Sequence, residues 1–116
     1  MGSKKKTATA NYRVRISENA LRDIDEITNY IALVSKEPAA AIKVGDAIFD
    51  TFYRIEQRPF AFRACEELAT KSKMYRRAIC LSWLIIYRIS VFEIVILGII
   101  HGSRIPTAIK PLKRIK

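Results

Sequence analysis

Few residues in this chain of 116 residues have side chains suited to acid–base or phosphate chemistry. His101 is the only histidine, and an unperturbed imidazole pKa of about 6.5 would suit a general acid or base. No carboxylate or nucleophile lies close to it in sequence, which favours a histidine that bonds to nearby backbone at a strand end. Paired carboxylates are absent from the strand-like second half, which contains Glu93 alone, and the acids of the first helix, including Asp23, are expected on a solvated face. The sequence also has no glycine-rich phosphate loop. The sequence alone therefore predicts no catalytic centre.

Metal and cofactor sites are also not predicted. Cys65 and Cys80 are the only cysteines, they are far apart, and no histidine accompanies them at ligand spacing. This pattern does not fit a zinc site or a disulfide scaffold. We expect two reduced thiols in a cytoplasmic protein with no metal and no cofactor.

Charge is distributed unevenly along the chain, whose formal net charge is +10. Residues 1–16 contain five basic residues and no acid, residues 17–67 have a net charge of −4, and residues 71–116 have a net charge of +9. The positive field of the second half favours an anionic partner, which could be nucleic acid, a membrane surface or an acidic protein. The alternative is a basic face that only aids solubility.

The first half of the chain has the pattern of one strand followed by two helices. Residues 12–16 alternate apolar and basic side chains, as in a half-buried strand. Apolar residues then recur at helical spacing over residues 18–34, with Ser17 as the N-cap, and again over residues 38–56, where Pro38 suits a first helical turn. The short link between them predicts an antiparallel helical hairpin. Residues 59–73 are expected to form an irregular connection.

The second half is strand-like, with strands expected near residues 75–81, 83–89 and 92–101. The connections are so short that these strands must form an antiparallel meander. The predicted fold class is therefore α+β, with a domain over residues 12–104, a flexible basic arm at 1–11 and a basic tail at 105–116. No apolar run reaches the roughly 18 residues of a membrane helix.

The last predicted strand is apolar on both of its faces. An uninterrupted alternation places Ile94, Ile96 and Ile100 on one face, and Val95, Leu97 and Ile99 on the other. A strand covered by helices on one side only should alternate apolar and polar residues. Something must therefore cover the second face, and the arm or tail of the chain and a partner protein are both candidates.

A series of short motifs occurs in the order of these elements. They are Ile16-Ser17-Glu18-Asn19-Ala20, Asp23-Ile24-Asp25-Glu26-Ile27, Glu67-Leu68, Tyr75-Arg76-Arg77, Leu84-Ile85-Ile86-Tyr87-Arg88-Ile89 and Ile94-Val95-Ile96-Leu97 with Ile100-His101-Gly102-Ser103-Arg104. Over about residues 12–104 this set resembles the RelE/ParE superfamily of bacterial toxins from type II toxin–antitoxin modules. The small α+β fold of that superfamily agrees with the elements above.

The resemblance implies a partner as well as a fold. Toxins of this kind are held inactive by an antitoxin, often acidic, that wraps a largely disordered segment around the toxin. Such a segment is a candidate cover for the second apolar face, and the implied antitoxin-binding residues are Val95, Leu97 and Ile99.

Two activities occur in the superfamily: RelE-like members are ribosome-dependent mRNA endonucleases, and ParE-like members inhibit DNA gyrase by binding. RelE-like toxins commonly have an arginine where this sequence has Leu84, and a tyrosine near the C-terminus, whereas this chain has no tyrosine after Tyr87. The resemblance is therefore to the ParE-like branch, and implies a gyrase-binding toxin of a plasmid-stabilisation module.

We expect the residues that bind the target to be basic and to occur late in the chain. They are Arg76, Arg77, Arg88, Arg104, Lys110, Lys113 and Arg114. The alternative is a RelE-like enzyme acting on ribosome and mRNA, in which His101, Arg77 and Arg88 would be the catalytic candidates.

Overall fold

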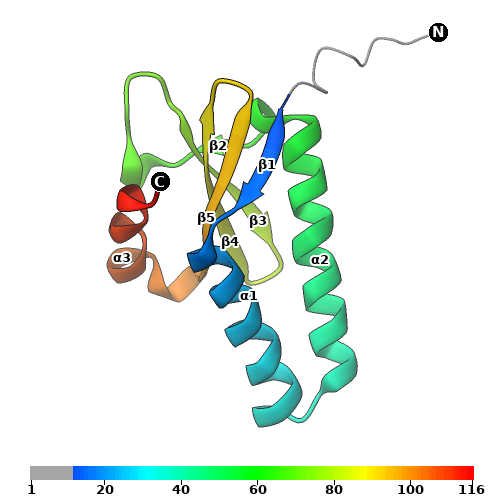
Figure 1. Cartoon of the computed structure of the whole chain (residues 1–116). Helices are drawn as coiled ribbons and strands as arrows, with labels where there is room; N and C mark the ends of the chain where they lie inside the picture. The colour runs from blue at the N-terminus through cyan, green and yellow to red at the C-terminus, as the bar shows by residue number, and fades with distance from the viewer. Residues whose placement is uncertain (1–11) are drawn as a thin grey trace, which may run out of the picture.

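The computed structural model describes residues 12–116, apart from the side chains of residues 105 and 106. The arm predicted at residues 1–11 lies outside the described residues. The main elements are β1 (Arg13–Ile16), α1 (Glu18–Asn29), α2 (Pro38–Gln57), β2 (Arg63–Ala64), β3 (Tyr75–Cys80), β4 (Trp83–Ser90), β5 (Glu93–His101), α3 (Ile105–Ala108) and the 3₁₀ helix η6 (Lys110–Arg114). The predicted α+β class, helical hairpin and three-stranded meander are confirmed (Figure 1).

The strands form one sheet in the order β1-β5-β4-β3-β2. The β3–β4 and β4–β5 pairs are antiparallel, as the short connections predicted. The first strand lies beside the last and runs parallel to it, with Val14 opposite Ile94 and Ile16 opposite Ile96. The helical hairpin is thus part of the connection between two parallel neighbours in the sheet. Such a connection has to cross over one face of the sheet, and this places both helices there.

Local sequence explains where the helices begin and end. The Ser17 hydroxyl accepts the backbone N–H of Ala20 at 3.0 Å, which caps α1. The helix predicted over residues 18–34 is α-helical only to Asn29 and then widens into a π-helical segment, Tyr30–Val34. Helix α2 begins at Pro38, where the missing N–H of proline costs nothing, and ends before Arg58 and Pro59.

One core lies between the helical hairpin and the sheet. Its buried members come from α1, α2 and three strands: Ala20, Ile24, Ile48, Phe52, Ile55, Ala78, Cys80, Ile85, Tyr87, Ile89, Ile94, Ile96 and Ile99. Tyr87 is fully buried, and its hydroxyl donates a hydrogen bond of 2.6 Å to the carbonyl oxygen of Pro59. Burial raises the pKa of Tyr87, against a smaller opposing effect of Arg76. The phenol therefore stays neutral and fixes the loop after α2.

A second core covers the opposite face of the sheet. Residues 105–116, here called the C-terminal segment, fold back over this face, so the sheet lies between the helical hairpin and that segment (Figure 1). The buried members are Cys65, Leu68, Tyr75, Leu84, Ile86, Val95, Leu97, Ile100, Ile109 and Leu112. Of the two covers considered for the second apolar face, the structure shows that of the chain itself. The segment expected to be a basic tail is packed on the sheet.

A β-bulge changes the side-chain pattern of β5. Ile86 lies opposite Gly98 while Tyr87 lies opposite Ile96, so Leu97 is an extra residue on β5. Beyond it the alternation reverses, and Ile99 joins the core under the helices while Ile100 joins the second core. The predicted faces of Ile99 and Ile100 were therefore wrong, because an uninterrupted alternation was assumed.

Two further predictions concerned the cysteines and the absence of a membrane-spanning helix. Both cysteines are free and buried. Among residues 12–116, no helix has the length and apolar character needed to cross a membrane.

Candidate functional site

A groove of about 580 Å³ lies between α1 and the end of β5. It exists because β1 ends at Ile16, whereas β5 continues to His101, so the outer edge of β5 has no neighbouring strand beyond Ile96. Helix α1 forms one wall, and the C-terminal segment forms another. The groove is lined by Asn19, Asp23, Glu26, Ile27, Tyr30, Ile31, Trp83, Ile99, Ile100, His101, Arg104, Ala108, Pro111 and Leu112.

Side chains from the start of α1 take the place of the missing strand. The Asn19 side-chain amide donates to the carbonyl oxygen of Leu97 at 2.9 Å, and the Ser17 hydroxyl donates to the same oxygen at 3.2 Å. An Asp23 carboxylate oxygen accepts the backbone N–H of Ile99 at 2.9 Å. These bonds satisfy backbone groups of β5 that would otherwise be left unpaired at a sheet edge.

Sequence reasoning missed these roles, since it placed Asp23 on a solvated face of the first helix. A signal was present: Asn19 and Asp23 are four residues apart and therefore share one face of α1. Their contact with β5 could not be foreseen without knowing that β5 lies beside β1. Partial burial raises the pKa of Asp23, the hydrogen bond from Ile99 lowers it to a smaller extent, and Glu26 adds a further rise.

The Asp23 carboxylate should make stability depend on pH. Because its pKa is raised in the folded state, the unfolded chain loses this proton first as the pH rises above 3.8. Ionisation then favours the unfolded state, and the unfolding free energy falls as the pH rises through the raised pKa. Asp23→Asn keeps an oxygen for Ile99 and cannot ionise. We expect the variant to gain stability relative to wild type between pH 3 and 7, as measured by urea unfolding.

A second variant separates ionisation from hydrogen bonding at this position. Asp23→Ala leaves the Ile99 N–H without its acceptor and, like Asp23→Asn, cannot ionise, so its unfolding free energy should be lower than that of Asp23→Asn by about 1–2 kcal/mol at every pH. A stability difference between wild type and Asp23→Asn that does not change with pH would contradict the assigned role.

The contacts of His101 are those of a residue at the end of a strand. Its Nδ1 lies 2.9 Å from the Ser103 hydroxyl and 3.3 Å from the Ser103 backbone nitrogen, which donates to it. Its ring meets Trp83 edge-on, with centroids 5.9 Å apart. The side chain is exposed, and its hydrogen-bond partners within the described part of the chain include no carboxylate.

The predicted target-binding arginines on β3 point to opposite sides of the sheet. Arg76 lies on the side of the helices, where it donates to the carbonyl oxygens of Lys73, Phe60 and Phe62 at 3.0, 3.2 and 2.8 Å. Its guanidinium also lies 5.2 Å from the centre of the Phe60 ring. Through these contacts Arg76 holds the loop after α2 in place. Arg77 is directed to the other side of the sheet, 3.8 Å from a Glu67 carboxylate oxygen.

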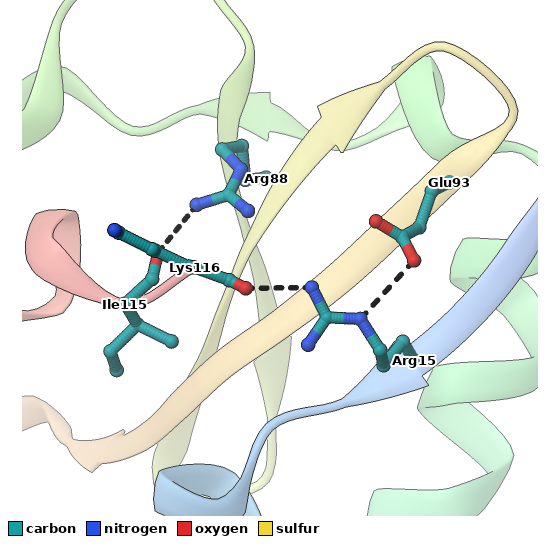
Figure 2. A network of polar contacts seen from close by, with 5 residues as sticks. All are labelled: Arg15, Arg88, Glu93, Ile115 and Lys116. Carbon is teal, nitrogen blue, oxygen red and sulfur yellow. Dashed lines mark hydrogen bonds and ion pairs between the residues drawn. The ribbon is translucent and has the colours of Figure 1, made fainter.

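Two arginines fasten the end of the C-terminal segment to the sheet (Figure 2). Arg88 of β4 donates to the carbonyl oxygen of Ile115 at 2.6 Å, and Arg15 of β1 donates to the main-chain oxygen of Lys116 at 2.7 Å. Arg15 also pairs with Glu93 at 3.1 Å. Arg15 and Arg88 flank the buried Val95, since the register places Arg15, Val95 and Arg88 in one row across the sheet.

The seven predicted target-binding residues thus do not form one cluster. Arg77 and Arg88 lie on the sheet face that the C-terminal segment covers, and Lys110, Lys113 and Arg114 are exposed on that segment. Arg76 lies on the helical side, and Arg104 lines the groove. Of the predicted antitoxin-binding residues, Val95 and Leu97 are fully buried beneath the C-terminal segment, while Ile99 lines the groove. The described residues contain no group of three potential metal ligands.

Comparisons with known proteins agree with this architecture. A chain of the chromosomal ParDE TA system from P. aeruginosa has a similar structure, with a TM-score of 0.64 at 21% sequence identity, over 79% of this chain and 97% of that one. At this identity the likeness shows a shared fold, that of a protein from a toxin–antitoxin module. Residues 14–106 match the family described as the ParE toxin of type II toxin-antitoxin system, parDE, and the chain belongs to that family. A comparison with curated protein sequences gives no match.

Proposed function

We propose that this protein is a toxin that binds and inhibits DNA gyrase in the cytoplasm and is neutralised by a cognate acidic antitoxin. Membership of the ParE toxin family supports the toxin role and implies an antitoxin partner. The net charge of +10 suits an acidic antitoxin, because opposite charges speed the encounter of two proteins.

One observation carries the choice of binding over RNA cleavage: the residues that catalysis would need are not assembled. His101 lies opposite Trp83 at one end of β4, and Arg88 lies five positions further along that strand, which corresponds to about 16 Å. Arg77 is near Glu67, and Arg88 is bonded to the Ile115 carbonyl oxygen. Phosphate cleavage needs a base and cations that converge on one phosphate.

The groove beside α1 is the surface that we propose for the antitoxin. Among the three residues predicted to bind it, Ile99 alone lines the groove, where 5% of its surface is exposed, whereas Val95 and Leu97 are covered by the C-terminal segment. An antitoxin segment bound in the groove would lie against α1 and the end of β5 and would not have to displace the C-terminal segment.

Two assays run side by side test the proposed activity. Wild-type protein should inhibit DNA supercoiling by purified gyrase and should not cleave mRNA on ribosomes. His101→Ala should inhibit gyrase within about twofold of wild type, because within residues 12–116 the imidazole forms its hydrogen bonds with Ser103 and its aromatic contact with Trp83, both at the strand end. Removing a general base lowers an enzymatic rate by about 10²–10⁴-fold, so the alternative predicts a large loss. Ribosome-dependent mRNA cleavage that His101→Ala abolishes, with gyrase untouched, would overturn the proposal.

A further inference from the structure

The turn between β4 and β5 presents two large apolar side chains to solvent. Val91 is 80% exposed and Phe92 is 62% exposed. Phe92 also has a φ of 63°, in the left-handed region that glycine and asparagine tolerate far better than bulky residues do. Two-residue hairpin turns normally use Asn-Gly or Asp-Gly for this reason. Both solvent and backbone geometry thus disfavour phenylalanine here, and such local conflicts are concentrated at functional sites.

The apolar surface extends from this turn onto neighbouring elements. Phe60 is 55% exposed, and Tyr12 packs edge-on against it with ring centroids 6.4 Å apart. An open hollow of about 330 Å³ lies among Tyr12, Phe60, Ser72, Met74, Ile89, Ser90 and Val91. We call the apolar side chains at this end of the molecule the tip surface; they are Tyr12, Phe60, Met74, Val91 and Phe92.

The rim of the tip surface is basic. The backbone N–H of Arg13 bonds to the Phe92 carbonyl oxygen at 2.9 Å, and the Arg13 side chain is exposed. Arg58 precedes Phe60 by two residues, and Lys71 and Lys73 flank Ser72; all three are exposed. Arg76 stacks on the Phe60 ring. The acid next to Phe92 is Glu93, and it is paired with Arg15. An acidic surface is therefore the electrostatic complement of this rim.

The other hairpin of the meander provides a contrast. Leu81, in the β3–β4 turn, is also 62% exposed and also has a positive φ, of 56°. The stretch from Ile79 to Trp83 has no charged residue, whereas exposed cations adjoin members of the tip surface in the sequence and Arg76 lies over the Phe60 ring. Exposure and strain are thus shared by the two turns, and the basic rim distinguishes one of them.

We propose that the tip surface is where the toxin docks on its target protein, through an acidic surface of gyrase with an apolar centre. The inference rests on the proposed gyrase binding and adds the surface that performs it. Protein interfaces combine buried aromatic anchors with a polar rim, and aromatic residues and arginine are enriched in them. Nucleic acid is less favoured, because base stacking would use the aromatic rings but not Val91 or Met74. Phe92 and Ile99, the groove residue of β5 that lies nearest to the tip in the sequence, are seven residues apart, which corresponds to about 23 Å along a strand, so the two surfaces are separate.

A matched pair of substitutions tests the tip surface. Phe92→Asn and Leu81→Asn each replace a large exposed side chain at a positive-φ turn position by a residue that suits the turn. Both variants should therefore melt at or above the wild-type temperature. Binding is measured with purified gyrase in the absence of DNA. We expect Phe92→Asn to weaken binding by at least about tenfold, as for an anchor residue, and Leu81→Asn to stay within about twofold.

A second pair tests the basic rim. Arg13→Gln removes an exposed cation beside Phe92, and Lys43→Gln removes an exposed cation from α2. Arg13→Gln should slow association with gyrase about two- to fivefold and reduce its salt dependence, and Lys43→Gln should do neither.

The outcomes separate failure of this inference from failure of the proposed function. Wild-type protein that does not bind gyrase overturns the proposed function, and with it this use of the tip surface. Wild-type binding that Phe92→Asn leaves intact, or that both asparagine variants weaken equally, overturns the tip surface alone. If Phe92→Asn instead weakens binding to DNA alone or to the antitoxin by the same factor, that result identifies a different occupant of the tip surface. It would also overturn the proposal that the tip surface binds gyrase.

Discussion

Replacement of Ile109 by alanine should lower the free energy of unfolding by about 3 kcal/mol, within the range of 2–5 kcal/mol for such truncations in a core. The side chain of Ile109 is 1% exposed and belongs to the same buried cluster as Val95, Leu97 and Ile86. Its truncation removes buried apolar area and leaves a cavity against β5. Urea unfolding of wild type and variant gives the difference directly.

The next residue along the chain supplies the matched control. Lys110 is exposed on the same short segment, so Lys110→Ala should change the free energy of unfolding by no more than about 0.5 kcal/mol. A loss for Ile109→Ala that is no larger than the loss for Lys110→Ala would mean that the C-terminal segment does not stabilise the sheet.

The position of this segment changes how its basic residues must be tested. Deletion of residues 105–116 is the simplest test of their role in target binding, but it would also uncover the buried side chains of Leu84, Val95 and Leu97. Loss of activity would then report loss of the fold. Replacement of Lys110, Lys113 and Arg114 by glutamine removes the charge and leaves Ile109 and Leu112 in place, so it tests the charge alone.

Periodicity in the sequence was sufficient to predict the helices and the meander, because burial on one face imposes a period that can be counted. Ile24 of α1, and Ile48 and Ile55 of α2, belong to the apolar stripes of their helices and are buried against the sheet, as those stripes predict. The apolar run from Ile94 to Ile100 correctly indicated that both faces of β5 are covered. The C-terminal segment has apolar residues at helical spacing (Ala108, Ile109, Leu112 and Ile115), but periodicity alone does not say which surface such a stripe covers.

The candidate site was less predictable, because its geometry depends on which strands are neighbours. The pairing of β1 with β5 brings Asn19 and Asp23 to the edge of β5, and no local pattern encodes a pairing between residues about 80 positions apart. The bulge at Leu97, which moves Ile99 to the other face, has no strong sequence signal either. Arg76 and Arg88 were predicted to bind the target because they are basic and occur late in the chain, and that role stays a prediction. The structure shows that both donate to backbone carbonyl oxygens.

Gly98 stands where the groove, the bulge and the second core meet. A Cβ atom at this position would lie 2.9 Å from Cδ2 of Leu112, 3.0 Å from Nδ2 of Asn19 and 3.2 Å from Oδ2 of Asp23. None of these atoms is free to move away at no cost. Leu112 is buried in the second core, while Asn19 and Asp23 are held by hydrogen bonds to Leu97 and Ile99. A glycine is therefore needed for the close approach of α1 and the C-terminal segment to β5.

We expect Gly98→Ala to lower the free energy of unfolding by about 2 kcal/mol, within the range of 1–3 kcal/mol that overpacking costs. Gly45→Ala is the control, because its Cβ would meet only Thr28 Cγ2, at 3.8 Å, and alanine in a helix interior should add about 0.5–1 kcal/mol of stability. Replacement of glycine by alanine should thus lower the free energy of unfolding at position 98 and raise it at position 45. In an Asn19→Ala background, part of the crowding at Gly98 is gone, so the further cost of Gly98→Ala should be smaller than in wild type. Equal costs in the two backgrounds would show that the Asn19 contact with β5 does not constrain this position.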